Sequence, residues 1–168
     1  MAQRAAETGA QVIYVATAAA GDSEMQSRIA HHQQRRPAHW QTLEEPLALG
    51  ALIQKHSRAD TVMLIDCLTV WLSNLLFSEQ RDFPDVGPIA PPSTFVQQRQ
   101  QLLHALEKVA GEVILVSNEV GMGIVPAGAV SRWFVDEAGR LNQAVAARCD
   151  QVIWVAAGLP LYLKGRAC

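Results

Sequence analysis

Residues 61–66 read Thr-Val-Met-Leu-Ile-Asp, a continuous apolar run that ends in an acidic residue. Apolar runs that do not alternate with polar residues are typical of parallel strands buried on both faces of a sheet. Three more runs share this pattern, and the four predicted strands are residues 12–16, 61–65, 113–117 and 152–156. Segments of helical period separate them. The sequence therefore predicts an α/β fold, doubly wound or related to that class, with a mostly parallel sheet flanked by helices.

Five segments show the helical period. The first begins at Asp22, whose side chain can cap a helix, and runs to about Arg35. The others span residues 44–56, 68–77, 94–109 and 129–148, the last with an irregularity near Gly139. Residues 79–92 are rich in proline, glycine and aspartate, which predicts an exposed loop.

The composition is that of a globular chain with one domain. Of its 168 residues, 49% are hydrophobic and 18% are charged, which excludes a disordered chain and allows a sizeable core. The formal net charge of −2 argues against binding to nucleic acid through bulk electrostatics. Polar residues interrupt the longest apolar run, residues 62–77, so no membrane span is expected.

The cysteines and the N-terminal residues indicate a cytoplasmic location. Cys67, Cys149 and Cys168 share no metal-ligand spacing and form no CxxC pattern, which is typical of a reducing cytosol. The first residues lack the apolar core of a secretory signal peptide.

Polar side chains follow three of the predicted strands. Thr17 follows the first strand, Asp66 the second, and the pair Asn118-Glu119 the third. Ligands of open α/β sheets bind beyond the carboxyl ends of the strands, so these residues predict one shared crevice. An acidic residue directly after a strand also holds Mg²⁺ in P-loop NTPases. The alternative for Asp66 is a helix cap, because a predicted helix begins at Leu68, and the pattern supports both equally.

A basic segment between the first two predicted strands carries the chemistry of phosphate attack. Residues 28–40 contain the pair His31-His32 and three arginines. A neutral imidazole is available near pH 7 as a nucleophile or base, and arginine pairs with phosphate oxygens through two nitrogens. The alternative is a solvated helix end whose histidines have no role.

Taken together, the segments resemble one known family. The matching pieces lie in residues 14–18, 22–25, 28–32, 36–40, 42–46, 65–76, 116–126, 139–143 and 157–160. In order and spacing they are similar to the bifunctional adenosylcobinamide kinase / adenosylcobinamide-phosphate guanylyltransferases of cobalamin biosynthesis, from about residue 3 to Lys164.

The resemblance implies a fold, two activities and an assembly. It implies a single P-loop NTPase-like (RecA-like) nucleotide-binding domain over residues 1–168 that forms a homotrimer. Members phosphorylate adenosylcobinamide and then transfer GMP from GTP to adenosylcobinamide phosphate through a GMP–histidine intermediate. The implied small molecules are therefore GTP, ATP, Mg²⁺, adenosylcobinamide and its phosphate.

The resemblance also assigns site residues. The nucleophile falls in the histidine pair and is placed on His32, which shares a helical face with Met25 and Ile29, whereas His31 turns aside. The implied nucleotide contacts are Ala16, Thr17, Ala18, Gln33, Gln34, Arg35, Arg36, Glu44 and Asp66, with Asp66 also a Mg²⁺ ligand. For Glu44 the residues leave open a second interpretation, a carboxylate in the first turn of a helix, which the helix dipole favours.

The chain departs from the family pattern in one respect. Family members open with a strand and the phosphate-binding loop Gly-Gly-x-Arg-Ser-Gly-Lys-Ser, but this chain contains no GxxxxGK[ST] motif. Without that loop, kinase activity is expected to collapse and GTP affinity to fall steeply. Strands beside the absent strand are expected to have unpaired backbone groups and an uncovered apolar face.

Three interpretations of this departure follow. Because the other site residues are present, we expect a bifunctional enzyme whose chain is truncated at its N-terminus relative to the family. The alternatives are a partial enzyme that retains only nucleotidyl transfer through His32, and a decayed, non-catalytic module that binds a nucleotide or a corrinoid.

Overall fold

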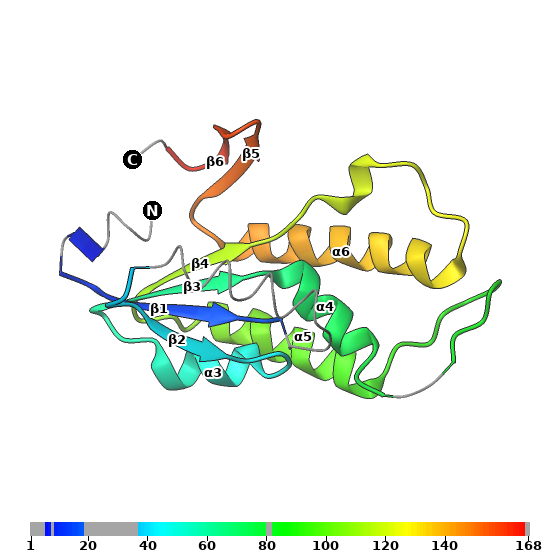
Figure 1. The fold of residues 1–168 in the computed structure, drawn as a ribbon, viewed down its shortest axis with the longest axis horizontal. Coiled ribbons are helices and arrows are strands. Elements are labelled where there is room, and N and C mark those ends of the chain that lie inside the picture. Colours follow the sequence, from blue (N-terminus) through cyan, green and yellow to red (C-terminus); the bar gives the residue numbers. More distant parts are fainter. Residues whose placement is uncertain (1–5, 8, 19–36, 80–81, 167–168) are drawn as a thin grey trace.

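The computed structural model describes residues 6–7, 9–18, 37–79 and 82–166 (Figure 1). They form a four-stranded parallel sheet in the order β2-β1-β3-β4 and a separate antiparallel pair, β5 and β6. The strands are β1 Gln11–Ala16, β2 Gln41–Glu44, β3 Thr61–Asp66, β4 Glu112–Val116, β5 Val152–Ala156 and β6 Leu159–Lys164. The helices are α3 Leu49–His56, α4 Leu68–Leu76, α5 Ser93–Leu106 and α6 Ala129–Arg148, with a 3-10 turn, η1, at Val120–Met122. The predicted α/β class with a mostly parallel sheet is confirmed.

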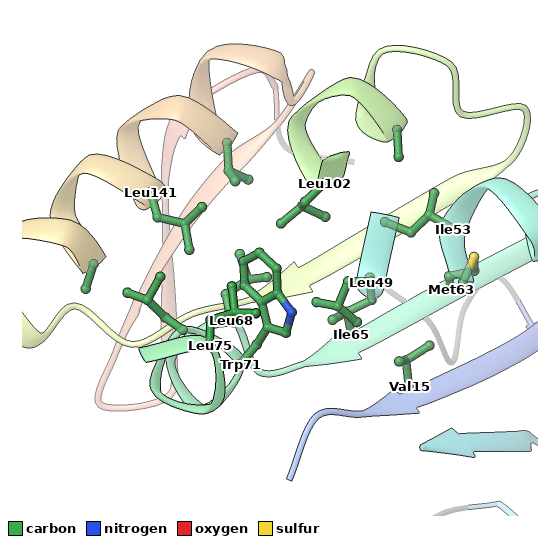
Figure 2. Packing of buried hydrophobic residues seen from close by; sticks show 14 of the residues in the cluster. Val15, Leu49, Ile53, Met63, Ile65, Leu68, Trp71, Leu75, Leu102 and Leu141 are labelled. Carbon is green, nitrogen blue, oxygen red and sulfur yellow. The ribbon is translucent and has the colours of Figure 1, made fainter. Parts of the chain in front are cut away.

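All four described helices pack against one face of the parallel sheet. Alternation along the strands directs Ile13, Val15, Met63 and Ile65 to this face, where leucines and isoleucines from the helices cover them. Trp71 of α4 is fully buried at the centre of this core (Figure 2). Each buried leucine or isoleucine contributes about 1.5–3 kcal/mol relative to an exposed one.

The opposite face has a smaller apolar cluster. Val12 and Val62 are buried there and pack with Trp40, Leu64 and Ile114. This cluster lies toward the amino ends of the strands, because Trp40 precedes β2 and Val12 is the second residue of β1. Among the described residues, the carboxyl-end residues of this face lie outside the cluster.

The prediction of a helix over residues 44–56 is wrong in its first part. Residues 41–44 form the edge strand β2, and the helix α3 begins only at Leu49. Pro46 explains the delay, because a residue before proline is disfavoured in the helical region. The Glu45 carboxylate instead accepts hydrogen bonds from the N–H groups of Leu47 (3.0 Å) and Ala48 (2.7 Å) ahead of the helix.

The prediction for residues 152–156 is right that they form a strand but wrong that this strand is buried and parallel. These residues form β5, which pairs antiparallel with β6, a strand that the apolar pattern did not predict. The turn between them has positive φ at both Ala157 and Gly158, as a two-residue hairpin turn of type I′ requires. In this hairpin Val155 is 61% exposed and Leu159 is 72% exposed.

The parallel sheet and the β5-β6 hairpin do not pair with each other in the described part of the chain. There β4 pairs only with β3, and β5 pairs only with β6. Figure 1 shows the hairpin standing apart from the parallel sheet. In the described part of the chain, β4 therefore has one edge without a strand partner, and the expected uncovered apolar face stays a prediction.

The remaining elements follow the prediction closely. α4 and α5 lie within a few residues of their predicted bounds, and α6 runs without interruption through Gly139, where an irregularity was expected. The predicted helix of residues 22–35 lies outside the described residues. Within the described residues, no helix is both long and apolar enough to cross a membrane.

Candidate functional site

The carboxyl end of the parallel sheet brings together three residues predicted for the site. In the strand register, Ala16 is paired with Glu44 on one side and with Asp66 on the other. Paired residues of parallel strands point to the same face, so both carboxylates lie on the face opposite the helical core. Two strand spacings separate them, roughly 10 Å between backbones. The small side chain of Ala16 is all that stands between them in this row.

Asp66 is held by a tyrosine that sequence reasoning did not select. The Tyr14 hydroxyl donates a hydrogen bond of 2.7 Å to Oδ2 of Asp66. The position that caps α4 is Cys67, with extended backbone and no capping hydrogen bond from its side chain. The interpretation of Asp66 as a helix cap is therefore wrong. The alternative for Glu44, a first-turn helix carboxylate, is wrong too, because Glu44 ends β2.

Thr17 joins the ends of β1 and β3. It is completely buried, its N–H donates to the Asp66 carbonyl (3.1 Å), and its hydroxyl donates to the Cys67 carbonyl (2.9 Å). The same hydroxyl accepts the Cys67 N–H at 2.8 Å. These three hydrogen bonds extend the strand pairing beyond the last strand residues and fix the backbone on both sides of the Asp66 side chain.

Asn74 of α4 fastens the ends of β1 and β2 to this frame. Its amide nitrogen donates to the carbonyl of Thr17 (2.7 Å) and to that of Pro46 (3.2 Å). One turn earlier, the Trp71 indole N–H donates to the Leu47 carbonyl (2.8 Å). Asn74 is one of three polar residues in a mostly apolar helix, with Thr69 and Ser73, so the sequence pattern does not single it out and its role depends on the tertiary structure.

The third predicted polar position lies at the same end of the sheet. Beyond β4, the Asn118 N–H donates to the Thr69 hydroxyl (2.8 Å), and the Ser117 hydroxyl donates to Asn142 (2.7 Å). The Asn142 amide nitrogen lies 3.4 Å from a carboxylate oxygen of Glu119, which is exposed. Thr17, Asp66 and the pair Asn118-Glu119 thus follow strands that end at the same edge of the sheet, and the shared crevice expected there stays a prediction.

At this site a metal ion would need a bound phosphate-containing molecule in addition to the protein side chains. The described residues include no group of three or more His, Cys, Asp or Glu side chains that could hold one. Mg²⁺, however, is commonly bound through one or two carboxylates, substrate phosphates and water. Because Tyr14 occupies only one of its oxygens, Asp66 suits a metal that arrives with phosphate groups.

An apolar pocket lies apart from this carboxylate row. It has a volume of about 300 Å³ and is lined by Ser73, Leu76, Phe77, Val120, Pro126, Val130, Ser131, Phe134 and Val135. Asp66 precedes the start of α4, whereas the pocket adjoins the end of that nine-residue helix, about 13 Å along its axis. The pocket is therefore separate from the row of Glu44, Ala16 and Asp66.

Several predicted site residues are not placed by the structure. His31, His32 and Gln33 through Arg36 lie outside the described residues. Ala18, the last described residue before them, is half-buried beside Thr17.

Comparison with known proteins gives a consistent result. A family model described as cobinamide kinase / cobinamide phosphate guanyltransferase matches residues 1–163. The chain is 51% identical over 161 residues to the bifunctional adenosylcobalamin biosynthesis protein CobP of Pseudomonas aeruginosa, covering 96% of this chain and 87% of that protein. It is 40% identical over 156 residues to the bifunctional adenosylcobalamin biosynthesis protein CobU of Escherichia coli, covering 92% and 86%. The protein of that name in Salmonella typhimurium is also 40% identical, over 161 residues.

Proposed function

Because the chain belongs to the cobinamide kinase / cobinamide phosphate guanyltransferase family, we propose that it transfers GMP from GTP to adenosylcobinamide phosphate in cobalamin biosynthesis. Phosphorylation of adenosylcobinamide, with ATP or GTP as donor, is the second activity that the family name supports. A homotrimer in the cytoplasm is part of the same proposal.

One observation supports the proposal beyond the family match. The strand register places Glu44 and Asp66 on either side of Ala16, at the sheet end where α/β folds bind nucleotides. We assign Asp66 to the phosphate end of the nucleotide through Mg²⁺, which would neutralise charge on the phosphates when bound. Glu44 is assigned to hydrogen bonds with the ribose or the guanine edge.

The proposed transfer proceeds in two displacements. A ring nitrogen of neutral His32 attacks the α-phosphorus of GTP, the bond to the bridging oxygen breaks, and pyrophosphate leaves. An oxygen of the cobinamide phosphate then attacks the same phosphorus and releases the imidazole. A covalent intermediate divides one difficult transfer into two easier steps.

The neighbouring residues would lower the barrier by electrostatic means. Two anions approach each other in both steps, so the guanidinium groups of Arg35 and Arg36 would offset the developing charge. Gln33, Gln34 and the backbone of residues 16–18 complete the proposed contacts with the nucleotide.

Transfer of a radioactive label tests this proposal. The protein is incubated with Mg²⁺ and millimolar α-³²P-GTP, and denatured samples are separated by gel electrophoresis. We expect an acid-labile, alkali-stable label, typical of a phosphoramidate, that is lost in His32→Ala and discharged by adenosylcobinamide phosphate. γ-³²P-GTP should leave no label, because the γ-phosphate departs with pyrophosphate.

His31→Ala is the matched control, since it removes the adjacent imidazole. A label that persists in His32→Ala and vanishes in His31→Ala would move the nucleophile to His31. GTP binding without any covalent label in the unmodified protein would refute catalysis and support the non-catalytic module.

A further inference from the structure

Tyr14 and Asp66 are neighbours because of the strand register. Tyr14 is paired with Leu64, so Asp66 lies two residues further along the adjacent strand. Side chains two residues apart in a strand share a face, and diagonal neighbours are within reach of an aromatic side chain. β1 lies between β2 and β3, so Tyr14 extends from a strand that is held on both sides.

The contact between them is short and largely protected from water. The phenol oxygen lies 2.7 Å from Oδ2 of Asp66, and Tyr14 is only 7% exposed. Hydrogen bonds from a hydroxyl to an ionised carboxylate are among the stronger ones in proteins. The donor is neutral, so it orients the carboxylate without cancelling its charge, whereas a lysine or arginine there would repel a divalent cation.

Hydrogen bonds from Thr17 fix the main chain on which the Asp66 side chain stands. Thr17 binds the Asp66 carbonyl and both backbone groups of Cys67, which fixes the main chain around Asp66. These bonds do not restrain the two side-chain torsions of Asp66. The Tyr14 hydroxyl restrains them by holding Oδ2, and it leaves Oδ1 available to a ligand.

We propose that Tyr14 is a positioning residue that orients Asp66 toward the metal ion of a bound metal–nucleotide complex. The inference rests on the proposed function, because it requires Asp66 to bind a metal together with GTP. Tyr14 itself touches neither the metal nor the nucleotide in this scheme. Its removal should therefore weaken metal binding without abolishing it.

Binding of Mn²⁺ provides a measurement that is independent of catalysis. Free Mn²⁺ is measured by electron paramagnetic resonance in the presence of a non-hydrolysable GTP analogue. Loss of a hydrogen bond to a metal-ligating group typically weakens metal affinity by 10- to 100-fold, and we expect about 10-fold for Tyr14→Phe. The chain has two tyrosines, so Tyr162→Phe on β6 makes the same chemical change far from the site and should have no effect.

Asp66→Asn separates the inference from the proposed function. It should weaken nucleotide-dependent Mn²⁺ binding more than Tyr14→Phe does, and adding Tyr14→Phe to it should cause no further loss. If Tyr14→Phe does not fold, as judged by thermal melting, Asp66→Glu replaces it. That variant keeps the charge but displaces the carboxylate from the phenol, and the same loss of about 10-fold is expected.

The outcomes distinguish the two ideas. If Asp66→Asn weakens binding and folded Tyr14→Phe does not, the inference about Tyr14 is refuted and the proposed function stands. If Asp66→Asn has no effect, or the unmodified protein shows no nucleotide-dependent Mn²⁺ binding, the proposed role of Asp66 is refuted together with the inference.

Discussion

Two helical glycines should respond to alanine in opposite directions. A Cβ atom added at Gly50 of α3 would lie 2.6 Å from the backbone carbonyl carbon and oxygen of Gln101 in α5. A Cβ atom at Gly139 of α6 would have nothing within 4 Å. Alanine is favoured over glycine inside a helix by about 0.5–1 kcal/mol. Gly139→Ala should therefore raise the free energy of unfolding by about that amount.

At Gly50 the free-energy cost of the clash with Gln101 outweighs the gain in helix propensity. The atoms that would clash belong to the α5 backbone, so no side-chain rotation relieves them, and the two helices must move apart. Overpacking of this kind costs about 1–3 kcal/mol, and more where the backbone cannot shift. After the gain in propensity, Gly50→Ala should lower the free energy of unfolding by about 1–2 kcal/mol.

Urea unfolding followed by tryptophan fluorescence measures both changes in the same way. The pair shares its chemical change and its secondary structure, so the difference in sign reports only the local packing. If Gly50→Ala proved neutral or stabilising, or if both variants changed stability by the same amount, the close packing of α3 against α5 would be refuted.

Three further predictions follow from single residues. Thr17→Val should lower the free energy of unfolding, measured in urea, by about 2–3 kcal/mol, because it removes two hydrogen bonds to Cys67. As the control, Thr94→Val on the first turn of α5 should change the free energy of unfolding by less than about 0.5 kcal/mol. Burial raises the pKa of the Cys149 thiol, a shift that the Lys164 charge partly opposes, so less thiolate forms at a given pH. Iodoacetamide should therefore alkylate a variant with Cys149 as its sole cysteine more slowly at pH 8 than a free cysteine peptide; equal rates would contradict the burial. A polypeptide of these 168 residues has no GxxxxGK[ST] motif. In an assay with γ-³²P-ATP it should therefore phosphorylate adenosylcobinamide at least about 100-fold more slowly than its longer relatives. Comparable rates would show that the motif is dispensable.

The strands that local pattern identified correctly are three of the parallel sheet: β1 and β3, which are mostly buried, and β4, which is half-buried at the sheet's edge. Residues 12–16, 61–65 and 113–117 are continuous apolar runs, and each lies within a residue of an observed strand. β2 was missed because it is a four-residue edge strand with one inward apolar side chain, Leu43, and such a segment has no distinct period. The apolar run at residues 152–156 predicted burial, but hydrophobicity alone does not say whether a strand is covered.

Site residues could be predicted from the sequence only where a local pattern marks them. Asp66 could be selected because an acidic residue after a buried strand is a local signal, and the structure places it in the row with Ala16 and Glu44. Tyr14 and Asn74 could not be selected, because their roles depend on partners 52 and 57 residues away in the chain.

By itself, the sequence determined the class of fold, the family, and the residue types available at the strand ends, since these depend on local period and on motifs in order. Tertiary structure alone decided which strands are adjacent and in which register. Register aligns Glu44, Ala16 and Asp66 in one row and brings the Tyr14 hydroxyl to the Asp66 carboxylate. Strand pairing is chosen by contacts between distant segments: the pattern within one segment indicates which of its faces is buried but not which strand lies beside it.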